Sequence, residues 1–198
     1  MNFLAHVALA FPDPNFVAGN FLADLIQKKD DQLLPNSILS GVIMHRWIDH
    51  YSNNHESLRI INKLFQPAVR KYAPVAGDII CDYFLFKNWT QYYPMSYRDF
   101  TEKIYHILLE MVPQFPTHTQ AITVRMVEAK WLNQYTSLTG INEVMNRMNK
   151  KAKFKVDFTT TLPIIEENER VLDENFNRFY KDIQNALGAA FTLQNEAK

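Results

Sequence analysis

Residues Gly41–His55 read GVIMHRWIDHYSNNH, a stretch that places ionisable residues at helical spacing inside an otherwise apolar segment. His45 and Asp49 are four residues apart in it. If Ser40 caps a helix that runs through this stretch, both side chains project from one face, about one turn (~5.4 Å) apart along the axis. In that arrangement they could hold a common ion.

Two other segments show the same spacing. Asn20 and Asp24 lie four residues apart in GNFLADLI, and Asp78 and Asp82 do so in GDIICDYFLF. Three helices that each present such a pair from apolar surroundings predict a polar centre inside a helical bundle.

The fold class predicted for the chain is all-α. The sequence contains only 5 glycines and no Asn-Gly turn signature, and long segments carry apolar residues at i, i+3 and i+4. A length of 198 residues suits one domain with a full hydrophobic core, so we expect a single domain over residues 1–198.

Prolines and polar runs divide the chain into helices. Pro67 and Pro74 are expected to frame a turn, and Ser96 to start a helix. The expected helices cover residues 2–10, 15–28, 40 to about 52, 56–65, 75–89, 96–112, 117–134, a short segment between Gly140 and a basic tract at 150–155, and 163–187.

The helix expected over 75–89 is apolar nearly all the way round, which is typical of a helix buried on most sides. A carboxylate there costs several kcal/mol unless it is protonated, paired or bound to a cation. Asp78 and Asp82 are therefore candidate ligands. For Asp82 the alternative is a buried salt bridge to Arg46.

Composition excludes several classes. Lys plus Arg equals Asp plus Glu at 21 each, so the chain lacks the global basic field of a non-specific nucleic-acid binder. The single Cys81 can form neither an internal disulfide nor a thiolate metal site, which fits a reducing, cytoplasmic compartment. The apolar start MNFLAHVALAF lacks a basic region and meets Pro12 far short of a membrane span, so we expect no membrane segment.

Carboxylates and imidazoles without thiolates suit Mn²⁺, Mg²⁺, Fe²⁺ or Zn²⁺, and such sites activate water against phosphoesters. The predicted chemistry is metal-assisted hydrolysis. Any one His-Asp pair at this spacing is more often a surface hydrogen bond, but three pairs in apolar settings favour a metal site. The other four histidines, His50, His55, His106 and His118, lie in polar surroundings and fit structural or solvated roles. The candidate ligands are His6, Asp24, His45, Asp49, Asp78 and Asp82.

Four ordered blocks, MNFLAHVALA, GNFLADLI, GVIMHRWID and DIICDYFLFKNW, resemble the acyl carrier protein phosphodiesterase family, and WLNQY and GINEVMNRM extend the resemblance over most of the chain. The resemblance implies a helical protein similar to HD-type phosphohydrolases that releases 4′-phosphopantetheine from the serine of holo-acyl carrier protein, most often with Mn²⁺. It also implies the same six ligands, with Asp24, His45, Arg46 and Asp49 in catalysis and Arg46 meeting phosphate.

Two positions depart from the family pattern. Ser52-Asn53 stands where the family reads Thr-Asp, and Asp82-Tyr83 stands where it reads Asp-His. Each change removes an ionisable group, which predicts weaker metal binding or altered catalysis. Asn53 can still coordinate through its carbonyl oxygen, and Tyr83 can still hydrogen-bond.

The predicted function is therefore metal-dependent hydrolysis of holo-acyl carrier protein, with that protein as the partner. Two alternatives stay open, namely a phosphohydrolase for a nucleotide or another small phosphoester, and a degenerate homologue that binds carrier protein without cutting it. Carrier proteins are acidic, so the tract Asn149–Lys153 is the predicted contact, although a solvated helix end is the simpler interpretation. The sequence leaves the oligomeric state open.

Overall fold

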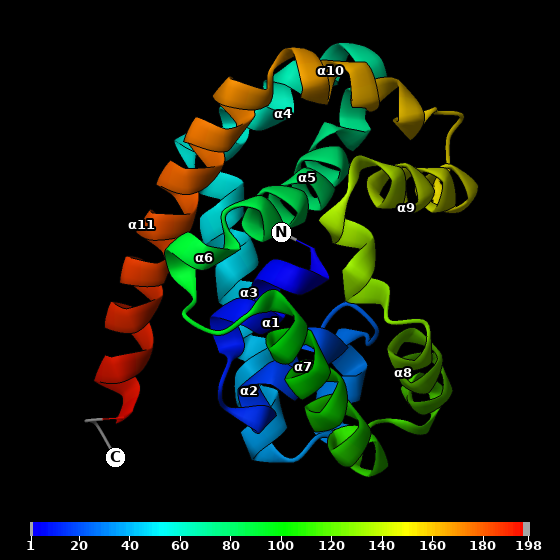
Figure 1. Cartoon of the computed structure of the whole chain (residues 1–198). Helices are drawn as coiled ribbons and strands as arrows, with labels where there is room; N and C mark the ends of the chain where they lie inside the picture. The colour runs from blue at the N-terminus through cyan, green and yellow to red at the C-terminus, as the bar shows by residue number, and fades with distance from the viewer. Residues whose placement is uncertain (1, 196–198) are drawn as a thin grey trace.

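The structure is a computed structural model that describes residues 2–195, and these residues form helices and their connections, with no strand among them (Figure 1). The predicted all-α class is confirmed. The helices are α1 (Phe3–Ala10), α2 (Pro14–Leu22), α3 (Asn36–Asn54), α4 (Glu56–Val69), α5 (Ala73–Lys87), α6 (Trp89–Tyr92), α7 (Tyr97–Met111), α8 (Thr117–Glu128), α9 (Leu138–Lys151), α10 (Leu162–Glu167) and α11 (Glu169–Asn195). Five 3₁₀ segments join them: η1 (Lys28–Leu33), η2 (Arg70–Tyr72), η3 (Val112–Gln114), η4 (Trp131–Thr136) and η5 (Phe158–Thr161).

Helix α1 lies at the centre of the bundle, in contact with α2, α3 and α5 (Figure 1). Its sequence FLAHVALA is apolar on all sides except at His6, and Leu4 to Ala8 are all buried. A helix without a polar face must be enclosed by its neighbours. His6 is thereby carried into the interior of the protein.

Two glycines let α2 and α3 approach closely. A Cβ atom on Gly19 would come within 2.6 Å of the Cα of Gly41, and one on Gly41 would come within 2.7 Å of the backbone oxygen of Phe16. Real Cβ atoms do not approach other atoms so closely, so any larger residue would push the two helices apart. This contact brings the end of α2 against the middle of α3, where His45 lies.

Several helix boundaries differ from those expected. Helix α3 begins at Asn36, so Ser40 lies inside the helix and its hydroxyl donates to the backbone oxygen of Asn36. Helix α4 continues through Pro67 to Val69, because a proline in the last turn removes only one backbone hydrogen bond. The turn follows at Arg70, which has a positive φ of 50°.

Three other expected helices are interrupted or end early. The segment expected to form one helix over 117–134 ends at Glu128, and Lys130 adopts a left-handed conformation before η4 begins. Helix α2 ends at Leu22, short of the expected residue 28. Asn168 separates α10 from α11. By contrast, Ser96 caps α7 as expected, and its hydroxyl accepts the backbone N–H of Asp99.

The buried apolar residues form one cluster, to which α11 contributes a stripe of Leu172, Phe176, Phe179 and Tyr180. Within the described residues, no helix is both long and apolar enough to cross a membrane.

Candidate metal centre

His6 on α1, His45 on α3 and Asp49 one turn later on α3 converge at one point. The Nε2 atoms of His6 and His45 each lie 3.1 Å from a different oxygen of the Asp49 carboxylate. The two imidazole rings stack with their centroids 3.8 Å apart. One ligand atom from each of the three residues fits within 4.8 Å of the others, a spacing at which they could share a metal ion.

Asn20 orients both imidazoles. Its side-chain nitrogen donates to the backbone oxygens of Phe16 and Gly41, each at 3.1 Å, so its side-chain oxygen faces the Nδ1 atom of His6 at 3.3 Å. The backbone oxygen of Asn20 accepts from Nδ1 of His45 at 3.0 Å. Both Nδ1 atoms therefore carry hydrogen.

In a neutral imidazole with hydrogen on Nδ1, the Nε2 atom carries a lone pair, and in both histidines this lone pair faces the Asp49 carboxylate. Lone pairs and carboxylate oxygens repel one another at 3.1 Å unless a proton or a cation lies between them. A neutral imidazole whose other nitrogen donates to a backbone or side-chain oxygen is also the usual form of a metal-ligating histidine. The arrangement fits a cation.

The pKa shifts agree with this donor set. Burial lowers the pKa of His6 to about 3, against the opposing effect of the Asp49 carboxylate, so its ring is neutral at physiological pH. Burial alone would raise the pKa of Asp49, but the imidazoles of His45 and His6 beside it hold it well below its usual range. The centre therefore offers neutral nitrogen and anionic oxygen, the donors that divalent cations require.

The centre opens to solvent on its carboxylate side. His6 and His45 are 1% and 4% exposed, whereas the side chains of Asp24 and Asp49 are 38% and 41% exposed. Asp24 lies in the turn after α2, with its carboxylate 3.5 Å from Nε2 of His45. Burial, together with the negative charges of Asp49 and Asp78, raises the pKa of Asp24.

Asp78 is half-buried on α5, and its charge contributes to the raised pKa of Asp24. The two carboxylates are therefore close enough for their charges to interact. Like Asp24, Asp78 falls outside the group formed by His6, His45 and Asp49.

The structure gives Asp82 a role that differs from the expected one. Its two carboxylate oxygens accept the backbone N–H groups of Leu4 and Ala5 at 2.8 and 3.0 Å, and the side chain is fully buried. Asn2 supplies no side-chain cap to α1, so the free N–H groups at the start of that helix take their acceptor from α5. Asp82 thus caps α1 and holds His6 in place from a distance.

Arg46 is also placed differently from the expectation. Its guanidinium forms a bidentate ion pair with Asp31 of η1, at 2.7 and 2.8 Å, and it makes no bridge to Asp82. Residue 46 follows His45 by about 100° around the helix, which turns its side chain toward η1 and away from α5.

Asn53 and Tyr83, the two departures from the family pattern, lie in different settings. Asn53 is exposed near the end of α3. Tyr83 packs edge-on against Phe84, with ring centroids 5.4 Å apart.

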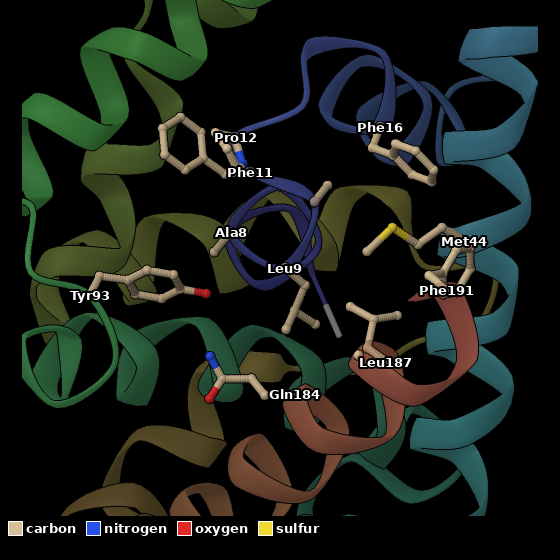
Figure 2. Close-up of a pocket in the computed structure, with 12 residues that line it drawn as sticks. Ala8, Leu9, Phe11, Pro12, Phe16, Met44, Tyr93, Gln184, Leu187 and Phe191 are labelled. Carbon is tan, nitrogen blue, oxygen red and sulfur yellow. The ribbon is translucent and has the colours of Figure 1, made fainter. Parts of the chain in front are cut away.

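A cavity of about 570 Å³ lies along another side of α1, between that helix and the C-terminal half of α11 (Figure 2). Its walls include Leu9, Phe11, Phe16, Met44, Leu187 and Phe191, which are labelled in Figure 2. No His, Asp, Glu, Lys or Arg lines it, so it lacks the groups that hydrolysis or metal binding requires. The candidate site is therefore the group of His6, His45 and Asp49.

Comparison with known protein families matches residues 1–183 to the family described as acyl carrier protein phosphodiesterase. This chain belongs to that family. It is 27% identical over 181 residues to an acyl carrier protein phosphodiesterase of Enterobacter sp. (strain 638), a match that covers 91% of this chain and 94% of the relative. It is also 30% identical over 149 residues to one of Escherichia coli O6:K15:H31, covering 75% of this chain and 77% of the relative. No solved structure matches the chain significantly, so similarity to HD-type phosphohydrolases stays a prediction.

Sequence reasoning missed the role of Asn20 as the residue that sets both tautomers. The sequence carries a signal for it, because Asn20 lies four residues before Asp24, at helical spacing. We expect Asn20→Ala to lower Mn²⁺ affinity by about 10 to 100-fold, the usual effect of removing a residue that orients metal ligands. Calorimetric titration with Mn²⁺ measures this.

Asn88→Ala is the matched control for Asn20→Ala. Asn88 is also buried, and its side-chain nitrogen also donates to a backbone oxygen four residues earlier. It lies at the end of α5, away from the two histidines. Equal Mn²⁺ affinity in the Asn20 variant and the parent would show that Asn20 does not position the ligands.

Proposed function

We propose that this protein hydrolyses the phosphodiester that joins 4′-phosphopantetheine to the serine of holo-acyl carrier protein, with a divalent cation held by His6, His45 and Asp49. One observation carries the proposal. Two buried imidazoles, both with hydrogen on Nδ1, direct their Nε2 lone pairs at the same carboxylate. Family membership supports the substrate.

Mn²⁺ is the cation proposed, since mixed nitrogen and oxygen donors suit it; Mg²⁺, Fe²⁺ and Zn²⁺ are alternatives. The bound ion supplies positive charge that stabilises the negative charge developing on the phosphoryl oxygens. Asp24 and Asp78 add negative charge beside the three ligands, and their carboxylates would complete the set of ligands around the cation. Asp82 is left out, because both of its oxygens are occupied at the start of α1.

Asp24 is the proposed proton acceptor. It is partly exposed, lies beside His45, and has a raised pKa, which brings it closer to the range in which a general base works at neutral pH. In this scheme Asp24 takes one proton from the attacking water, the water oxygen bonds to phosphorus as the phosphorus–oxygen bond to the carrier serine breaks, and the leaving serine oxygen takes a proton from solvent water. Asp49 and Asn20 hold the imidazoles throughout.

Arg46 is not part of this scheme. The sequence predicts that it meets phosphate, but its guanidinium is bound to Asp31 by two hydrogen bonds. A phosphate group at Arg46 would have to displace that carboxylate.

The cytoplasm is the proposed location. The one cysteine, Cys81, is a buried free thiol, as in proteins of reducing compartments.

The test of the proposed function is incubation of Mn²⁺-loaded protein with holo-acyl carrier protein and, separately, with a panel of nucleotides. Mass spectrometry follows released 4′-phosphopantetheine or phosphate. Release of 4′-phosphopantetheine supports the proposal. Turnover of nucleotides alone favours the alternative of a small-phosphoester hydrolase, and binding of carrier protein without release favours a non-catalytic homologue.

The basic tract at the end of α9 is the proposed contact for the acidic carrier protein. Lys150, Lys151 and Lys153 are all exposed there. Reversal of all three to Glu is expected to slow association with carrier protein by about tenfold or more and to flatten its salt dependence, because steering between opposite charges is lost. Stopped-flow measurement of the association rate at several salt concentrations checks this.

A control variant with the same change in net charge reverses Lys103, Arg178 and Lys181, which are exposed on α7 and α11. It should bind carrier protein at nearly the parent rate. If the α9 variant also binds at the parent rate, the tract is merely solvated.

A further inference from the structure

Besides the cavity next to α11, a cavity of about 450 Å³ lies between α8, η4 and α9, beside the start of α1. In Figure 1, α8 and α9 lie on one side of the molecule, and η4 joins them as it passes α1. We call this cavity the α8–α9 pocket. Its volume falls in the range of small-molecule sites.

The α8–α9 pocket is cationic. Arg125 of α8 and Arg147 and Lys151 of α9 line it, and no Asp or Glu does. Among the described residues none of these three forms an ion pair; Arg147 instead donates to the side-chain oxygen of Gln134, which also lines the pocket. Three like charges around one concavity repel each other, and an anion between them removes that repulsion.

The remaining walls are largely apolar. Phe3, Ile122, Met126, Val144 and Met148 contribute carbon and sulfur surface to the pocket. Methionines adapt their shape to different ligands. A wall of this composition favours a ligand with an apolar body over a simple inorganic ion.

Trp131 adds an independent observation. It lines the pocket and is 6% exposed, and its indole nitrogen has no hydrogen-bond partner among the described residues. A buried N–H group without an acceptor is destabilising.

The pocket is separate from the metal centre but close to it. None of its lining residues belongs to the group of His6, His45 and Asp49. Asn2, at its edge, donates to the hydroxyl of Tyr135 at 2.8 Å. His6 follows Asn2 by four residues, about 6 Å along a helix axis.

We propose that the α8–α9 pocket binds a small organic anion, with a phosphate or carboxylate between Arg125, Arg147 and Lys151 and an apolar body against the walls of Phe3, Met126 and Met148. Charge-assisted hydrogen bonds from arginine hold such groups in two-pronged geometry. This site is distinct from the proposed phosphodiesterase centre, and it would exist whether or not that centre hydrolyses carrier protein.

The experiment is calorimetric titration of the whole protein with four probes: octyl phosphate below its micelle concentration, octanoate, octanol and inorganic phosphate. Octyl phosphate or octanoate should bind at least tenfold more tightly than octanol or inorganic phosphate. The tighter of the two anions identifies the head group as phosphate or carboxylate. Binding of octanol as tight as that of both anions, or no binding of either anion, would overturn the proposal.

The location of the anion is tested with Arg125→Gln combined with Arg147→Gln, which should weaken anion binding at least tenfold, since the charge-assisted hydrogen bonds of both guanidinium groups are lost. The matched control is Arg98→Gln with Arg178→Gln, two exposed arginines outside the pocket. Unchanged affinity in the pocket variant, or an equal loss in the control, would place the anion elsewhere. Should circular dichroism show that the pocket variant loses helix, Lys151→Gln, at the exposed end of α9, is used for the same comparison with a smaller expected loss.

Discussion

Replacement of Asp49 by Asn is expected to lower Mn²⁺ affinity by more than about 100-fold and to reduce release of 4′-phosphopantetheine below detection. The reason is local. Asp49 is the only carboxylate that faces both buried imidazoles at 3.1 Å among the described residues, and an amide of the same shape provides no charge for a divalent ion. Loss of a ligand should exceed the roughly 10 to 100-fold effect of losing a residue that only orients ligands.

Metal content after dialysis, Mn²⁺ calorimetry and mass spectrometry of the carrier protein measure the effect of Asp49→Asn. Asp182→Asn is the matched control, because Asp182 also lies against a histidine, His55, at 3.2 Å, on the surface of α11. Parent-like Mn²⁺ affinity in the Asp49 variant would remove the group of His6, His45 and Asp49 from the proposed function. Loss of affinity in both variants would point to a general effect of charge.

The fold class and most helix starts could be predicted from local sequence, because periodicity and caps act within a few residues. Ser96 shows this, since its hydroxyl caps α7 as expected. The ends of α2 and α8 could not be predicted, since both fall inside segments with continuing helical periodicity. Tertiary contacts decide these ends: Asp24 leaves the helix where the carboxylates gather, and Lys130 turns the chain so that Trp131 reaches the core.

The site was predictable in part for the same reason. The spacing of His45 and Asp49 follows from one helix, and the structure brings these two residues together with His6. The partners of Asp82 could not be read from local sequence, because its hydrogen bonds join residues 77 and 78 positions apart. A buried carboxylate needs partners, but sequence alone does not tell a cation from the free N–H groups of a helix start.

Asp82 should therefore affect stability and its pH dependence more than metal binding. Burial, opposed by the hydrogen bonds from Ala5 and Leu4, raises its pKa from 3.8 to about 7. The native state then binds a proton more tightly than the unfolded state does. The stability that this proton provides is complete below about pH 4 and is lost as pH rises toward 7.

Urea unfolding of the parent, Asp82→Asn and Asp82→Ala between pH 4 and pH 8 separates the effect of Asp82 protonation from the effect of its hydrogen bonds to α1. The asparagine side chain does not ionise, so its variant should gain stability relative to the parent as pH rises, by about 4 kcal/mol over that range at 1.36 kcal/mol for each unit of pKa difference. The alanine variant leaves the N–H groups of Leu4 and Ala5 both without an acceptor, whereas the single amide oxygen of asparagine still accepts from one of them, so the alanine variant should be about 1 to 3 kcal/mol less stable than the asparagine variant at every pH. Mn²⁺ affinity of the asparagine variant should equal that of the parent, since Asp82 lies outside the group of His6, His45 and Asp49. If the difference in stability between the parent and the asparagine variant does not change with pH, the raised pKa is contradicted. If a stably folded asparagine variant loses most of its Mn²⁺ affinity, Asp82 returns to the set of metal ligands.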